Sequence, residues 1–131
     1  MSQEQSELSV EHAVDAKFEN FDPKGIYQIR DLGVKGATGG VFEARILAAA
    51  EKCPAALGNH RHAVTFQMVY VLKGWAKFYF EGTGEVEATP GTCINMPGGI
   101  VHDLRDHSDD FEFIEIISPA QFDTEWMKPV E

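Results

Sequence analysis

Two short blocks of the chain read HRHAVTFQ at residues 60–67 and GTCINMPGGIVH at residues 91–102. The first block places His60 and His62 two residues apart, so on an extended strand both imidazoles point to the same side. Neutral imidazole is the commonest protein ligand for transition metals. The imidazole of His102, presented from another strand of a β-barrel, could complete such a site. The two blocks therefore predict a metal centre with open positions for water or substrate.

Short runs rich in β-branched and aromatic residues surround these blocks and alternate with turn residues. The Lys73-Gly74 pair predicts a tight hairpin between two of the runs. Apart from one helical turn expected within residues 121–127, no window shows a helical period of useful length. Many short strands with regular turn signals indicate a sandwich or a barrel. We predict strands at residues 27–30, 41–47, 66–72, 75–81, 85–88, 92–96, 101–105 and 111–117.

Alternation along these runs predicts which side chains face the barrel interior. In the run 66–72, Gln67, Val69 and Val71 share one face, and the opposite face is apolar too. Because both faces are apolar, we expect one to look into the barrel and the other to pack on a second sheet or a second subunit. In the run 75–81 the predicted inward side chains are Ala76, Phe78 and Phe80. We expect a homodimer that buries the outer face of this second run.

Length and charge narrow the class of protein and its partners. The 131 residues are enough for one domain with a core and too few for two. A formal net charge of −10 disfavours nucleic acid as a partner, because neutralising phosphates requires clustered Lys and Arg. No stretch approaches the roughly 20 apolar residues of a membrane span, and the polar N-terminus lacks the layout of a signal peptide. We therefore expect a cytoplasmic protein that binds a small molecule, with neither nucleic acid nor membrane as a partner.

Composition also suggests where the barrel begins and ends. Residues 1–24 are polar and acidic, and we expect them to form a tail or a strand exchanged with a partner subunit. The barrel is predicted to occupy residues 25–120, and residues 121–131 are predicted to form a C-terminal tail.

The spacing within the first block resembles the first motif of the cupin superfamily. His60-x-His62 is followed by four residues and Gln67, and then by six residues and Gly74. The family usually has Glu where this chain has Gln67.

The second block is similar to the second cupin motif. Gly91 is followed by five residues, then by Pro97-x-Gly99, two further residues and His102. The resemblance spans roughly residues 40–117 and is closest to the small single-domain bacterial cupins with a cupin 2 conserved barrel. It implies an all-β fold, the double-stranded β-helix or jelly-roll barrel.

By this resemblance, one divalent transition metal would be bound by His60, His62, Gln67 and His102. An amide oxygen is a weaker and neutral donor, so Gln67 either ligates the metal or hydrogen-bonds a metal-bound water. Three imidazoles and an amide suit Fe, Mn, Ni, Cu or Zn, and the residues do not choose among them.

An amide cannot act as a general base, so Gln67 removes the proton acceptor that a carboxylate would supply there. It also leaves the metal with its full charge, which makes the metal a stronger Lewis acid. Glu115, in a run where Phe113 is its inward neighbour, is the candidate catalytic base that would replace it, and a surface charge is the alternative for this residue. We expect Arg45 to lie outside the barrel, the alternative being that it faces inward and holds a substrate carboxylate. His107, beside a turn-like sequence, is expected to be exposed to solvent.

These residues favour a small metal-dependent enzyme of dioxygenase, lyase, isomerase or cyclase type. Its substrate would be an oxygen-rich or aromatic small molecule activated by the metal as a Lewis acid. Two alternatives stay open. One is a non-catalytic cupin that senses a small molecule or binds a metal, and the other is a structural barrel whose site is vestigial.

Overall fold

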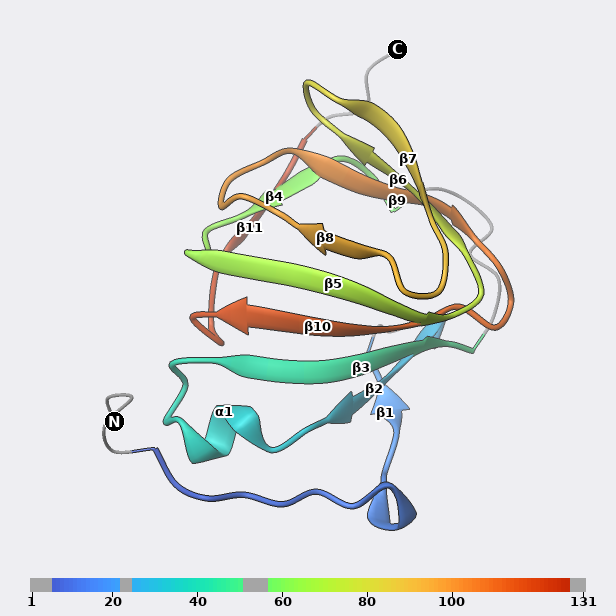
Figure 1. The fold of residues 1–131 in the computed structure, drawn as a ribbon. Helices are drawn as coiled ribbons and strands as arrows, with labels where there is room; N and C mark the ends of the chain where they lie inside the picture. The colour runs from blue at the N-terminus through green and yellow to red at the C-terminus, as the bar shows by residue number, and fades with distance from the viewer. Residues whose placement is uncertain (1–5, 22–24, 51–56, 128–131) are drawn as a thin grey trace.

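The computed structural model describes residues 6–21, 25–50 and 57–127, and nearly all of the regular structure in them is β. Two antiparallel sheets face each other (Figure 1), with strand orders β1-β2-β3-β10-β5-β8 and β11-β4-β9-β6-β7. This arrangement confirms the predicted jelly-roll barrel. The strands are β1 Glu19–Asn20, β2 Tyr27–Asp31, β3 Glu43–Ala49, β4 His60–His62, β5 Phe66–Lys73, β6 Ala76–Phe80, β7 Gly84–Ala88, β8 Cys93–Asn95, β9 His102–His107, β10 Glu112–Ser118 and β11 Thr124–Trp126. A 3-10 turn, η2, covers Ala13–Asp15, and one short helix, α1, covers Val34–Ala37.

The core lies between the two sheets and follows the alternation of each strand. In β10, Phe113, Glu115 and Ile117 are buried while the residues between them are only partly so. Phe113 lies opposite Leu47 of β3 and Val71 of β5, and all three are buried. The second sheet contributes Ala76, Phe78 and Phe80 of β6, which confirms their predicted inward direction.

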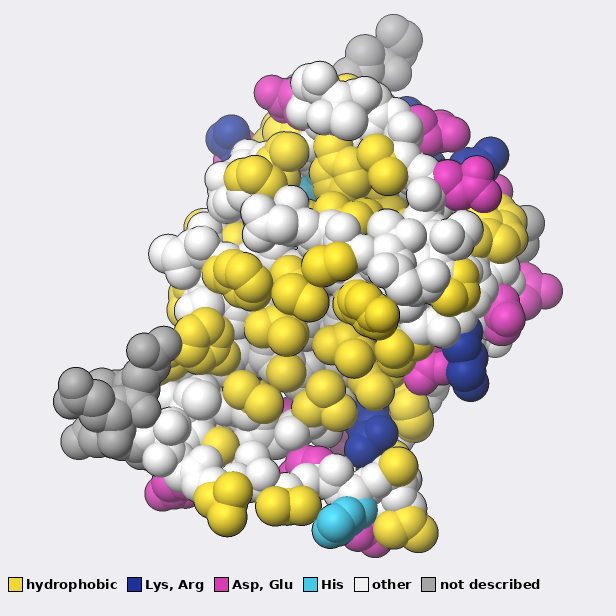
Figure 2. Space-filling view, viewed as in Figure 1, with side chains coloured by type: hydrophobic (Ala, Val, Ile, Leu, Met, Phe, Trp, Pro, Cys, Tyr) yellow, Lys and Arg dark blue, Asp and Glu magenta, His cyan; other side chains and the backbone are white. Residues whose placement is uncertain are grey.

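The outer face of the six-stranded sheet is strongly apolar. Phe66 and Tyr70 of β5 are 38% and 39% exposed. Tyr70 lies opposite Ile114 of β10, which in turn lies opposite Ile46 of β3. Figure 2 shows apolar side chains gathered over these strands. The described residues include no helix that is long and apolar enough to cross a membrane.

Two predictions about side-chain direction are wrong. Arg45 does not lie outside, because the register of β3 places it opposite Glu115 on the inner face, and its side chain is only 13% exposed. His107 is not in solvent but is fully buried, and its ring stacks on Phe111. A bulge in β9 explains its burial: Phe78 pairs with Leu104 while Ala76 pairs with His107, so one extra residue reverses the alternation before His107.

The helical turn predicted within residues 121–127 is also wrong, because residues 124–126 form β11. This strand pairs with β4, with Thr124 opposite His62 and Trp126 opposite His60. The glycine-rich turn after β2 contains α1. The boundaries predicted for the tails and the barrel remain predictions, although β1 pairs with β2 within the same chain.

Candidate metal centre

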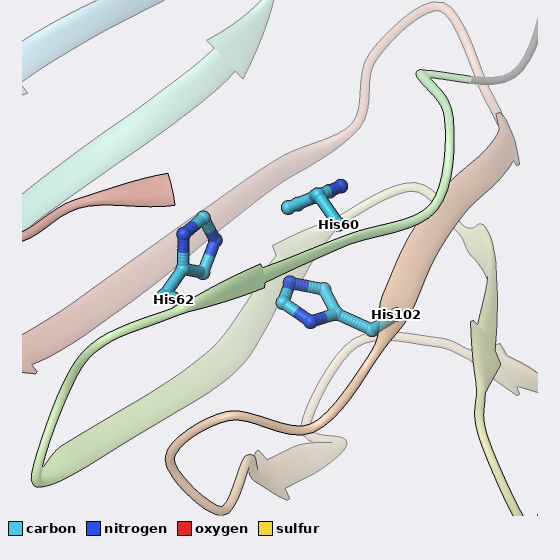
Figure 3. Close-up of side chains that lie close together, drawn as sticks. All are labelled: His60, His62 and His102. Carbon is cyan, nitrogen blue, oxygen red and sulfur yellow. The ribbon is translucent and has the colours of Figure 1, made fainter. Parts of the chain in front are cut away.

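The three histidines of the two sequence blocks come together between β4 and β9 (Figure 3). His60 lies directly opposite His102 in the antiparallel pair of strands, and their ring centroids are 4.3 Å apart. The ring of His62 is 4.9 Å from that of His60 and 5.0 Å from that of His102. One donor nitrogen from each ring lies within 4.8 Å of the other two. This arrangement allows all three imidazoles to bind one ion.

Each of the three rings is held by a hydrogen bond at Nδ1. The Nδ1 of His60 is 2.7 Å from the carbonyl oxygen of Gly58, and that of His102 is 3.0 Å from the carbonyl oxygen of Ile100. A carbonyl oxygen only accepts, so both Nδ1 atoms carry the proton and both Nε2 atoms keep their lone pairs. The Nδ1 of His62 is 2.8 Å from the hydroxyl oxygen of Thr124. Such bonds orient imidazole rings as metal ligands, and the site therefore fits a transition metal.

The environment also favours neutral imidazoles. Burial is the largest cause that lowers the pKa of His62 to about 4, and His102, His60 and Arg45 lower it further. Burial likewise lowers the pKa of His102, although its hydrogen bond to Ile100 and the charges of Glu115 and Asp103 oppose the shift. Metal ligands must be deprotonated, so these shifts keep both rings ready to bind near neutral pH.

The C-terminal strand forms a wall beside the histidines. Phe122, Thr124 and Trp126 alternate in sequence, and each contacts one of the rings. The ring of Phe122 is 5.1 Å from that of His62, and the indole of Trp126 is 4.5 Å from the ring of His60. None of these three residues was predicted to belong to the site. Their alternation within residues 122–126 is the signal that could have identified a strand there.

Main-chain contacts join the turn before His102 to the first block. The Gly99 nitrogen donates a hydrogen bond of 3.0 Å to the carbonyl oxygen of His62. A Cβ atom at Gly98 would collide with the carbonyl group of Val64, so only glycine lets the two segments approach so closely. The turn therefore fixes the position of His102 relative to His62.

Gln67 and Glu115 lie together inside the barrel. Gln67 is 3% exposed, and its Nε2 donates to Oε2 of Glu115 over 3.1 Å. The other carboxylate oxygen accepts from Arg45 Nε at 2.9 Å and Nη2 at 2.6 Å. The structure thus brings the predicted metal ligands and the predicted base into the same barrel. It adds Arg45, which the sequence analysis had placed outside.

Comparison with known proteins identifies the family. The model of the Cupin domain matches residues 50–117, which include both histidine blocks. The chain therefore belongs to the cupin family. No match is found among curated proteins.

Several solved structures share the fold. KdgF from Halomonas sp. has a TM-score of 0.70 and 18% identity, with 86% of this chain and 96% of that chain covered. The polyketide cyclase RemF from Streptomyces resistomycificus has a TM-score of 0.73 and 18% identity, with 95% and 89% covered. Oxalate decarboxylase from Bacillus subtilis, a protein with Mn(II) centres, has a TM-score of 0.58 and 16% identity, with 77% and 27% covered. At these identities the likeness concerns the fold alone.

Proposed function

We propose that this chain is a metal-dependent enzyme that holds one divalent transition metal with His60, His62 and His102. The observation that carries the proposal is the cluster of three imidazoles whose Nδ1 atoms are all hydrogen-bonded. Gln67 is proposed to complete the metal site through its amide oxygen. When bound, the metal would act as a Lewis acid that polarises an oxygen atom of the substrate.

The proposed substrate is an oxygen-rich or aromatic small molecule. Phe122 and Trp126 support this class, because they place two aromatic side chains beside the histidines, and Trp126 is 58% exposed. Aromatic rings and sugar faces stack well on such side chains. The reaction would be of dioxygenase, lyase, isomerase or cyclase type. Similar folds are found in a polyketide cyclase and in a DMSP lyase, which agrees with this range.

Glu115 is the proposed proton acceptor. It is 8% exposed and adjoins Gln67, whose amide cannot take up a proton. Arg45 stabilises the ionised carboxylate through two hydrogen bonds.

A non-catalytic cupin that binds or senses a small molecule is the second candidate. It is favoured by the fact that both oxygens of Glu115 already accept hydrogen bonds, one from Gln67 and the other from Arg45. A carboxylate engaged in this way is less available to a substrate proton.

The first test is metal analysis of the purified protein and of the variants H60A and H102A. Stoichiometric metal is expected in the wild type and its loss in both variants. The proposal is contradicted, and a vestigial site favoured, if the wild-type protein carries no metal and takes up none on reconstitution.

The second test separates enzyme from sensor. Oxygen consumption and product formation are measured for catechols, flavonols and 1,3-diketones with the Fe, Mn, Ni and Zn forms. Turnover with one of these forms supports the enzyme. Tight ligand binding without turnover in any form supports the sensor.

We also propose that a second copy of the chain covers the apolar outer face of the six-stranded sheet. Phe66 and Tyr70 of β5 are exposed large apolar side chains on this face. A contiguous exposed apolar patch of this kind usually marks an interface. Light scattering after size-exclusion chromatography should give the mass of a dimer for the wild type. A monomeric wild type contradicts this part of the proposal.

A further inference from the structure

Three polar side chains form a continuous hydrogen-bonded row on the inner face of the six-stranded sheet. Arg45 of β3, Glu115 of β10 and Gln67 of β5 come from three adjacent strands. Glu115 lies directly opposite Arg45, and it lies opposite Val69, two residues from Gln67. Gln67 and Glu115 are buried, and a buried polar group that loses its hydrogen-bond partner destabilises the fold, so the partners within the row are strongly constrained.

The row determines which way the Gln67 amide faces. A carboxylate only accepts hydrogen bonds, so the group of Gln67 that faces Glu115 must be its NH2. The opposite orientation would bring the amide oxygen against a carboxylate oxygen. Arg45 prevents Glu115 from turning away, because it donates from both Nε and Nη2 to the same oxygen, Oε1. The amide oxygen of Gln67 is consequently directed away from Glu115.

The row also lies within electrostatic reach of the histidines. The charge of Arg45 lowers the pKa of His62, and the charge of Glu115 raises the pKa of His102. Only the oxygen of an amide can bind a metal, because the amide nitrogen has no lone pair available. The orientation of Gln67 therefore decides whether it can contribute to the site.

We infer that Glu115, held in place by Arg45, is a positioning residue that turns the amide oxygen of Gln67 toward the three-histidine site. This inference rests on the proposed metal site and deepens it. In this role Glu115 acts through Gln67, so its loss alters metal binding before any substrate is present. A role limited to proton transfer would leave metal binding unchanged.

The test exchanges the two side chains. In E115Q, the introduced amide must present its oxygen to Arg45 and its NH2 to Gln67, which forces Gln67 to turn its own NH2 toward the histidines. We expect zinc to bind about 10–100-fold more weakly, as for other losses of an outer hydrogen bond to a metal ligand. In the double variant Q67E/E115Q, the amide introduced at position 115 accepts from Arg45 through its oxygen, and its NH2 donates to the carboxylate introduced at position 67. This exchange restores every hydrogen bond and leaves the net charge unchanged, and a carboxylate oxygen is a stronger donor than an amide oxygen, so we expect an affinity at least equal to that of the wild type.

Zinc affinity is measured by competition with a chromophoric chelator, and the visible spectrum of the cobalt(II) form reports the ligand geometry. E43Q is the matched control, because Glu43 lies 3.9 Å from the same Arg45 and E43Q makes the same charge change. We expect E43Q to keep the wild-type affinity and cobalt spectrum. Thermal unfolding of each metal-free variant checks that the barrel is intact.

Three results would overturn the inference. The first is an E115Q variant with wild-type affinity and an unchanged cobalt spectrum. The second is an E43Q variant that loses as much affinity as E115Q, which would make the effect one of charge alone. The third is a double variant that does not recover. Failure of the metal site itself is distinguishable, since the wild type would then bind no zinc.

Discussion

His102 and His107 stand at the two ends of β9, and both are buried. Their ring neighbours differ within the part of the chain that the structure describes. His102 faces the rings of His60 and His62, whereas His107 packs against Tyr27 and Phe111. Each is also anchored at Nδ1 by a backbone carbonyl, so the anchoring bond does not distinguish them. The difference lies in what surrounds each ring. His102 lies beside two other imidazoles in the candidate metal centre, whereas the described neighbours of His107 are aromatic side chains of the core.

The contrast extends to the walls around each ring. The His102 end is closed by side chains of β11, among them the half-exposed Trp126. The His107 end is lined by Phe111 and Tyr27, which are 0% and 5% exposed. We therefore expect substitutions at the first end to change metal binding and substitutions at the second end to change stability.

The largest effect is expected for H102A. Removing one of three imidazoles should weaken zinc binding by at least about 100-fold, more than the usual effect of losing a residue that only supports a ligand. Chelator competition measures the affinity, and thermal unfolding of the metal-free protein should show a smaller loss of stability than in H107A, because the ring of His107 is fully buried. An unchanged zinc affinity would show that His102 is only another core histidine.

H107A should lower stability and leave zinc affinity nearly unchanged, which is the reverse of H102A. It leaves a void beside Phe111 and removes the Nδ1 bond to Ser108, so we expect a loss of about 2–4 kcal/mol in the free energy of unfolding. Urea denaturation of the metal-free protein measures this loss. Zinc affinity of the folded variant should stay within about threefold of the wild type, since supporting a ligand is worth about 10-fold or more. If H107A lost more zinc affinity than H102A, the proposed contrast between the two histidines would be wrong.

A smaller effect on binding is expected for T124V. The substitution keeps the shape of the side chain and removes the hydroxyl that contacts Nδ1 of His62. Zinc affinity should fall about 10-fold, because the ring loses the bond that orients it. T124S retains the hydroxyl and is the control, with an affinity close to that of the wild type. Equal zinc affinities in T124V and T124S would show that the hydroxyl of Thr124 does not support metal binding by His62.

The smallest effect concerns pH. The pKa of His62 is lowered from 6.5 to about 4 in the folded protein. As the solution is acidified, His62 therefore takes up a proton at a higher pH in the unfolded chain than in the folded protein. The stability of metal-free protein should therefore be fully present above about pH 6.5 and decline as the pH falls from about 6.5 toward about 4. Thermal unfolding across this range measures the decline. H62A should show a shallower decline than the wild type, and an equal slope in both proteins would contradict the assignment.

Much of the fold follows from local patterns. Turn residues and alternation located most strands, and the spacing of His60 and His62 predicted that their rings share a face, while His102 entered through the resemblance to the second cupin motif. These features are local, because residues two apart on a strand share a face wherever the strand lies.

The features that were predicted wrongly depend on contacts between distant segments. A single extra residue in β9, opposite β6, turns His107 inward, and no local signal marks that bulge. Arg45 faces inward because the register of β3 aligns it with Glu115, seventy residues further along the chain. β11 contains three residues and exists as a strand through its pairing with β4. Periodicity within one segment cannot supply such information.

The close approach of Gly98 to the carbonyl group of Val64 affects which substitutions this barrel can accept. The second histidine block is docked on the first through main-chain atoms, at the Gly99 nitrogen and against the carbonyl group of Val64. The docking requires glycine at two positions, because no side chain fits at Gly98 and the backbone of Gly99 adopts a φ of 80°, which other residues rarely adopt. Other side chains of the barrel do not take part in these main-chain contacts. A mutant library that holds positions 98 and 99 constant could explore new ligands while the histidine cluster stays in place.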